Sequence, residues 1–265
     1  MSRALKDLVK ATLKRFSVGI TTYSHLQQLE KNYRASDDIE LLLELPDRHT
    51  AQLLRSLRDS RSQWRQDLFV LSELDFKRKG FFVEFGAFNG VDSSNTYLLE
   101  KKFEWDGILA EPDRRWHTDL RNNRTCRIET DCVWRDSNST LTFNQVEGSG
   151  GGGGLSTIDS FSSSDNHSQS RKHGIKYSVK TISLEDLLDK HNAPRMIDYL
   201  SIDTEGSEYE ILSSFDFEKY QFGVITVEYA IEPKREKLFE LLSKYGYVRK
   251  LAKFSEFDDW YVKAD

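Results

Sequence analysis

The sequence predicts an α/β protein with a Rossmann-like, doubly wound sheet of seven strands, preceded by a helical N-terminal extension. Three observations lead to this fold class. Apolar runs of strand length alternate with segments of helical periodicity through most of the chain. The first run is followed by Gly86, Gly90 and a helix, and the second run ends in the acidic residue Glu111.

The stretch 80–111 reads as strand, glycine turn, helix and strand. Glu111 follows Gly86 by 25 residues, which is typical of a nucleoside-binding βαβ unit whose acid accepts hydrogen bonds from ribose hydroxyls. The glycines alone fit any α/β turn equally well, but with Glu111 they favour a nucleoside site. Since the third glycine of a dinucleotide fingerprint is missing, a nicotinamide dehydrogenase is disfavoured, and S-adenosylmethionine is the expected ligand.

Composition and charge narrow the function classes. The chain has 265 residues and a net charge of −5, and it lacks recurrent basic runs, so nucleic acid is not an expected partner. Cys126 and Cys132 lack metal-site spacing and the N-terminus lacks an apolar signal core, which predicts a reducing, cytoplasmic setting. No apolar run approaches the roughly 20 residues of a membrane span. Whether the protein forms a homo-oligomer is left open.

Residues 1–61 are expected to form a helical extension or cap, and residues 62–265 the catalytic domain. Residues 3–16 form a basic amphipathic pattern, which suits either a membrane surface or packing on the protein's own domain. Further helices are expected at 39–45 and 51–57, interrupted near Pro46. A helix at 62–70 then leads into the first strand.

After Glu111 we expect a helix at 114–123, a third strand at 126–130 and an added strand at 141–143. Asp131 would follow the third strand, where its carboxylate could reach an adenine amino group or simply be solvated. Residues 148–170 contain a run of glycines and then many serines. This segment suits a flexible linker or a mobile lid, and we favour a lid because regular elements resume immediately after it.

The C-terminal half continues the alternation. The expected strands are 177–182, 196–202 and 222–227, and the expected helices are 183–191, 209–215 and 234–245. Ser183 is expected to cap the first of these helices. Segments 247–254 and 260–263 are expected to form an antiparallel pair at the edge of the seven-stranded sheet.

Several blocks of the sequence resemble the FkbM-type methyltransferases. Residues 82–90 (FVEFGAFNG) look like the first motif of that family, and Ser94-Asn95-Thr96 resembles the start of the following helix. Residues 105–112, the block 199–208 (YLSIDTEGSE) and Val227-Glu228 are similar to later family motifs. The sequence departs from the family at Thr204, where Val or Leu is common, and in its long glycine run. Both departures concern only the part of the site that would bind the methyl acceptor.

The resemblance implies transfer of a methyl group from S-adenosylmethionine, usually to a hydroxyl oxygen, with a sugar or other glycoconjugate as the acceptor. The alternatives are a divalent-metal-dependent O-methyltransferase acting on another small hydroxylated molecule and a non-catalytic, methyltransferase-like binding domain. The positions that the family motifs place at the cofactor are Glu84, Gly86, Ala87, Asn89, Gly90, Asn95, Glu111, Pro112 and Asp203, and the end of the third strand adds Asp131.

A hydroxyl group is a weak nucleophile at neutral pH, so its methylation needs a general base or a metal. Asp203, Glu205 and Glu228 lie at or near the ends of two neighbouring strands and could hold Mg²⁺ or another divalent ion, or one could act as base. Alternatively, Glu205 and Glu228 only position loops. We favour the hypothesis without a metal. In a continuing strand Asp203 and Glu205 would point to opposite faces of the sheet, so all three carboxylates converge only if the chain turns near Gly206. His173 could act as a base on lid closure, or be merely solvated.

Overall fold

The computed structural model describes residues 35–146, 152–229, 232–252, 254 and 257–264. The chain divides into two compact units, residues 1–44 and 45–265. Of the first unit, the described residues 35–44 are helical. The amphipathic segment 3–16 lies outside the described residues. All elements below belong to the second unit.

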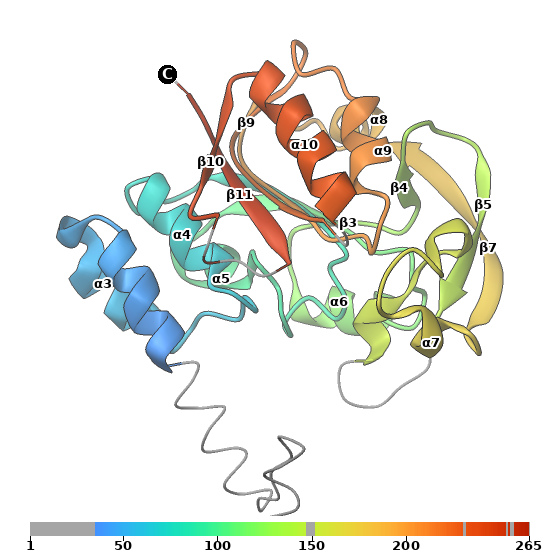
Figure 1. Cartoon of the computed structure of the whole chain (residues 1–265), viewed down its shortest axis with the longest axis horizontal. Coiled ribbons are helices and arrows are strands. Elements are labelled where there is room, and N and C mark those ends of the chain that lie inside the picture. The colour runs from blue at the N-terminus through green and yellow to red at the C-terminus, as the bar shows by residue number, and fades with distance from the viewer. Residues whose placement is uncertain (1–34, 147–151, 230–231, 253, 255–256, 265) are drawn as a thin grey trace, which may run out of the picture. The chain divides into compact units, whose positions relative to one another are not determined.

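The main sheet has seven strands in the order β10-β11-β9-β8-β1-β2-β3 (Figure 1). Their bounds are β1 (Phe81–Phe85), β2 (Asp106–Ala110), β3 (Arg127–Glu129), β8 (Met196–Ile202), β9 (Gln221–Glu228), β10 (Tyr247–Lys250) and β11 (Asp258–Lys263). Strand β11 runs antiparallel to β9 and β10, and the other pairings are parallel. The order reverses at β1, so the predicted doubly wound class and its edge hairpin are confirmed. The expected strand 247–254 ends earlier, because Leu251 turns the chain with a φ of +48°.

Helices cover both faces of this sheet. Helices α8 (Leu184–Lys190), α9 (Glu208–Ser213) and α10 (Glu232–Lys244) lie together in Figure 1. Their buried side chains share one core with alternate residues of the central strands, including Val83 and Leu200. Helices α4 (Gln66–Glu73), α5 (Tyr97–Phe103) and α6 (His117–Asn123) belong to the other face. There Phe69 packs on Trp260 of β11, with ring centroids 4.7 Å apart.

The strand register decides which residues meet at the carboxyl edge of the sheet. Phe85 of β1 pairs with Ala110 of β2 on one side and with Ile202 of β8 on the other. The next residue of each strand is therefore Gly86, Glu111 or Asp203, and these three emerge side by side. This edge, beside the point where the strand order reverses, is where open α/β sheets bind ligands.

A second, smaller sheet was not expected from the sequence. It contains β4 (Cys132–Trp134), β7 (Ile175–Ser183), β5 (Thr140–Gln145) and β6 (Thr157–Ile158), in that order. The expected strands 141–143 and 177–182 exist but pair with each other, antiparallel, within this sheet. The sheet has its own apolar core, in which Phe143 and Ile158 are buried with Trp134.

The described part of the glycine- and serine-rich segment forms short elements. These are η2 (Gly152–Leu155), β6, η3 (Asp159–Phe161) and α7 (Ser168–Arg171). Residues 147–151 lie outside the described residues. The segment is fixed by the burial of Ile158 in the core of the second sheet and by polar bonds, such as that from the Asn144 side chain to Ser162 at 2.8 Å. Its expected motion as a lid remains a prediction.

Residues 45–61 contain η1 (Asp47–His49) and α3 (Thr50–Ser56). The buried His49 ring bonds Ser72 at 2.9 Å and Asp75 at 2.8 Å, which ties this stretch to the end of α4. The proposed boundary between residues 61 and 62 remains a prediction. Over the described residues, the structure contains no helix with the length and apolar character of a membrane span.

Candidate active site at the carboxyl edge of the main sheet

Gly86 allows the loop after β1 to cross the end of β8 at very close range. Its φ is +70°, in the left-handed region, and a Cβ atom at this position would lie 1.9 Å from the carbonyl oxygen of Asp203. No side chain fits there. Gly90, with a φ of +78°, is likewise enclosed by Arg124 and Leu120. The loop is thus held against both β8 and α6.

Glu111 is nearly buried and is oriented by the backbone. Its two carboxylate oxygens accept hydrogen bonds from the N–H groups of Phe88 and Asp113, both at 2.8 Å. Burial outweighs these bonds and raises the pKa of Glu111 to about 8. Each oxygen retains a lone pair, so the carboxylate fits a pair of ribose hydroxyl donors.

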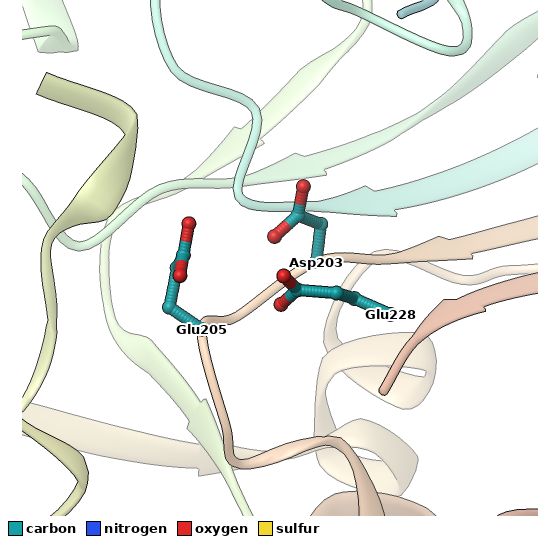
Figure 2. A group of neighbouring side chains, drawn as sticks. All are labelled: Asp203, Glu205 and Glu228. Atoms are coloured by element: carbon teal, nitrogen blue, oxygen red, sulfur yellow. The ribbon is translucent and has the colours of Figure 1, made fainter. Parts of the chain in front are cut away.

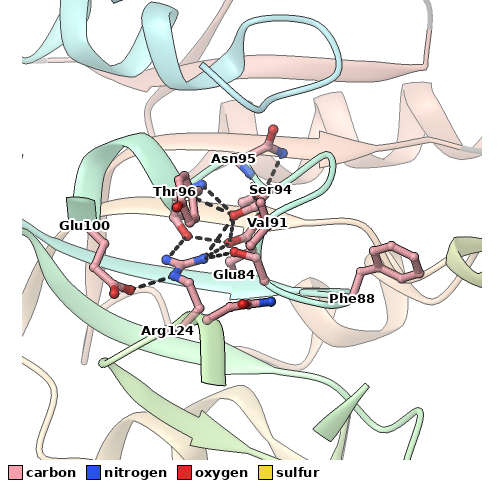
Figure 3. Close-up of polar contacts among 12 residues, drawn as sticks. Glu84, Phe88, Val91, Ser94, Asn95, Thr96, Glu100 and Arg124 are labelled. Atoms are coloured by element: carbon pink, nitrogen blue, oxygen red, sulfur yellow. Dashed lines mark hydrogen bonds and ion pairs between the residues drawn. The ribbon is translucent and has the colours of Figure 1, made fainter. Parts of the chain in front are cut away.

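Glu84 lies beneath the loop in a polar network that Figure 3 shows. Its carboxylate accepts bonds from the Ser94 hydroxyl at 3.0 Å, from the Asn95 N–H at 2.7 Å and from the Thr96 hydroxyl. Arg124, fully buried, donates to both of those hydroxyls, and it donates as well to the Gly90 carbonyl at 3.1 Å. Glu84 is therefore committed to shaping the loop.

The Arg124 guanidinium is balanced by a second carboxylate. It binds Glu100 of α5 at 2.7 Å. The positive charge of Arg124 and hydrogen bonds to Glu100 outweigh burial and lower the pKa of Glu100 to about 2. The network therefore joins α5, α6 and the glycine loop through charged groups that are largely buried.

The remaining predicted cofactor positions are spread around this loop. Asn89 accepts bonds from the N–H groups of Val91 and Asp92, both at 2.9 Å, and so closes the turn. The side-chain nitrogen of Asn95 donates to the Ser201 hydroxyl of β8 at 2.9 Å, and its side-chain oxygen, Oδ1, is buried without a hydrogen-bond partner among the described residues. Three more positions flank the site, namely Ala87 in the loop, Pro112 after Glu111 and Asp131 after β3.

Asp203, Glu205 and Glu228 converge at the ends of β8 and β9 (Figure 2). One carboxylate oxygen of each lies within 4.8 Å of those of the other two. The chain turns sharply after β8, with φ values of +59° at Glu205 and +123° at Gly206. This turn supplies the geometry that convergence requires. We call these three residues the acidic group.

The acidic group holds protons more tightly than isolated carboxyl groups do. Asp203 keeps part of its surface in solvent, but partial desolvation of its carboxylate, followed by the charge of Glu208, raises its pKa to about 7. Burial and then the charge of Asp203 raise the pKa of Glu228 well above its usual value. The same two causes raise the pKa of Glu205, whereas Arg171 lowers it. Because the carboxylates interact strongly, they titrate together, and no single proton can be assigned to one residue.

The predicted base His173 and the neighbouring Glu208 are not members of the acidic group. His173 is exposed in the turn between α7 and β7 and is not part of the acidic group. Its role as a base on closure remains a prediction. Glu208, which the sequence analysis left without a role, accepts bonds from the N–H groups of Thr204 and Gly206 and holds the 203–206 turn in place.

Sequence reasoning missed several residues that build this site. Phe88 and Trp116 form an aromatic pair beside Glu111, with ring centroids 4.1 Å apart. Arg124 follows a helix, and Arg171 lies in the serine-rich segment, so neither belongs to a motif. An arginine flanked by polar residues reads as a surface residue in sequence. Only the fold shows that both guanidinium groups are buried against carboxylates.

Comparisons with known proteins identify the family of this chain. A family model described as the methyltransferase FkbM domain matches residues 84–249. Among solved structures, the chain is similar to a precorrin-6y C5,15-methyltransferase from Geobacter metallireducens GS-15, with 13% identity and a TM-score of 0.42, covering 75% of this chain and 87% of that one. It is also similar to a methyltransferase FkbM from Methylobacillus flagellatus KT, with 11% identity and a TM-score of 0.41, covering 81% of this chain and 60% of that one. A search of curated proteins gave no match.

Proposed function

Because the chain belongs to the FkbM methyltransferase family, whose members depend on S-adenosylmethionine, we propose that it methylates a hydroxyl oxygen of a sugar or glycoconjugate. When bound, S-adenosylmethionine supplies a methyl group that its sulfonium activates for displacement. The protein then has to bind the cofactor, orient the acceptor oxygen, exclude water and receive the hydroxyl proton.

On the cofactor side, Glu111 is the proposed ribose ligand. The two backbone bonds that it accepts fix its orientation, and its ionised form is the better acceptor for hydroxyl donors. Gly86 lets the loop 86–90 lie close against the end of β8 at the same edge, and we expect the backbone of this loop to line the cofactor site. We place Asn95 and Asp131 at the periphery of this site, with Asp131 near the adenine amino group.

The single observation that carries the reaction type is the convergence of the acidic group beside the cofactor edge. Asp203 directly follows β8, next to Gly86, and Glu228 ends β9. The Oε2 atom of Glu228 is buried and, among the described residues, has no hydrogen-bond partner. We assign Asp203 and Glu228 to accept the acceptor's hydroxyl proton between them.

A metal-dependent reaction is the second candidate. The close approach of three carboxylates would suit a hard divalent ion, which would lower the pKa of an acceptor hydroxyl. The two candidate reactions predict different effects of a chelator on turnover. Dialysis against EDTA leaves turnover unchanged if a carboxylate is the base and abolishes it if an ion is required.

The acceptor class is tested with methyl-labelled S-adenosylmethionine and a panel of mono- and oligosaccharides, glycolipids, carboxylic acids and amines. We expect label in carbohydrate products that survive mild alkali, since methyl ethers are stable there and methyl esters are not. Label confined to amine or ester products would contradict the proposal. Labelling with Asp203→Asn as the negative control separates enzymatic transfer from chemical methylation.

A further inference from the structure

Arg171 is a buried cation directly behind the acidic group. Its side chain is fully buried, and its Nη2 atom donates to Glu205 Oε2 at 2.6 Å. Its Nη1 atom donates to both carboxylate oxygens of Asp165, at 2.7 Å each. Its Nε atom donates to the Leu155 carbonyl oxygen at 2.7 Å. A guanidinium with all three nitrogens engaged has a fixed position.

The segment that carries Arg171 is docked on the turn that carries Glu205. The Thr157 hydroxyl donates to the backbone carbonyl of Glu205 at 3.0 Å. Lys234 of α10 donates to the Gly206 carbonyl at 2.6 Å, and its ammonium lies 4.8 Å from the centre of the Phe161 ring. Several independent contacts thus hold the 152–171 segment against the 203–206 turn. The surrounding structure therefore fixes the pairing of Arg171 with Glu205.

We propose that Arg171 is the resident cation of the acidic group, a positioning residue that holds Glu205 and takes the place that a divalent ion would otherwise fill. This inference rests on the proposed function and decides between its two candidates. It leaves Asp203 and Glu228 to face the acceptor, with Glu205 drawn toward the 152–171 segment.

Charge and coordination both support this assignment. A divalent ion bound by the acidic group needs an oxygen of Glu205, and because Glu205 Oε2 already accepts from Arg171, only Oε1 is left for such an ion. Two positive charges a few ångströms apart repel strongly inside a protein. Removing the guanidinium would leave Glu205 and Asp165 buried without their counter-ion, a state that favours uptake of another cation.

The test measures Mn²⁺ binding by electron paramagnetic resonance, using the full chain without cofactor or acceptor. For the wild type we expect only weak binding, with a Kd on the order of 1 mM or above, as for loosely held cations. Arg171→Gln should bind Mn²⁺ at least about tenfold more tightly, because the competing positive charge is gone. Arg171→Lys retains the charge and should stay like the wild type.

Lys172→Gln is the matched control, since it removes the same charge one residue away from an exposed side chain. It should leave Mn²⁺ binding unchanged. Circular dichroism melting confirms which variants are folded. Micromolar Mn²⁺ binding by the wild type would overturn the proposal, with no variant needed, and so would a folded Arg171→Gln that gains no affinity. Since no step uses an acceptor, these results are independent of whether the acceptor is a sugar.

Discussion

Replacing Gly86 with alanine is the sharpest perturbation of the site. The added Cβ atom would lie 1.9 Å from the carbonyl oxygen of Asp203, which is backbone and cannot rotate away. Relief requires the loop after β1 and the end of β8 to separate by more than 1 Å, since carbon and oxygen pack at roughly 3.2 Å or more. The same movement would displace Asp203 from Glu228.

The expected loss of stability has two parts. A non-glycine residue at a φ of +70° costs roughly 1–2 kcal/mol. Forced separation of packed backbone adds about 1–3 kcal/mol, as overpacking does in protein cores. We therefore expect Gly86→Ala to lower the free energy of unfolding by about 2–5 kcal/mol.

Urea denaturation followed by circular dichroism measures this loss, and calorimetric titration with S-adenosylhomocysteine measures the effect on the cofactor site. Gly154→Ala is the control, because an added Cβ there meets no atom within 4 Å and the position has no left-handed φ. It should be nearly neutral. A Gly86→Ala protein with wild-type stability and cofactor affinity would refute the close approach of loop and strand.

Three more predictions follow from buried charges and from the covering segment. Burial raises the pKa of Asp67 to about 6 from 3.8, so this carboxyl should contribute up to about 3 kcal/mol of stability that is lost as the pH rises from 4 to 7. Over this range the wild type should therefore lose up to that much more stability than Asp67→Asn, and parallel pH curves in urea melts would contradict this. Asp203→Asn should slow methyl transfer at least about a hundredfold while retaining cofactor binding, and full activity would show that the acidic group is misassigned. Hydrogen exchange in residues 152–170 should slow when acceptor and S-adenosylhomocysteine bind, and equal protection without ligands would rule out a lid.

Sequence periodicity predicted the main sheet well because its central strands, such as β1 and β8, are largely buried and form continuous apolar runs. It also placed Glu111, Asp203 and Glu228 at strand ends, and the register then brings Asp203 beside Gly86. The second sheet escaped prediction for two reasons. Periodicity indicated strands at 141–143 and 177–182 but not that they pair with each other, and strands as short as Cys132–Trp134 carry little periodic signal.

The buried ion pairs of the site could not be predicted from the sequence, for a different reason. Arg124 and Arg171 have partners 24 and 34 residues away in the chain, so no local pattern links them. Glu84 matches a cofactor motif, yet its oxygens bond the loop itself. Motif and periodicity give the order of elements, whereas the pairing of buried charges depends on the three-dimensional arrangement.

The central claim is that the carboxyl edge around Glu111 binds S-adenosylmethionine, and calorimetric titration of S-adenosylhomocysteine tests it most directly. The wild type should bind one equivalent, more tightly as the pH rises from 6 to 8, because Glu111, with a pKa of about 8, must ionise to accept the ribose hydroxyls. Glu111→Ala should weaken binding by about 1–3 kcal/mol, whereas Asp119→Ala, which removes an exposed acid on α6, should not. Unchanged affinity in a folded Glu111→Ala protein would contradict the account.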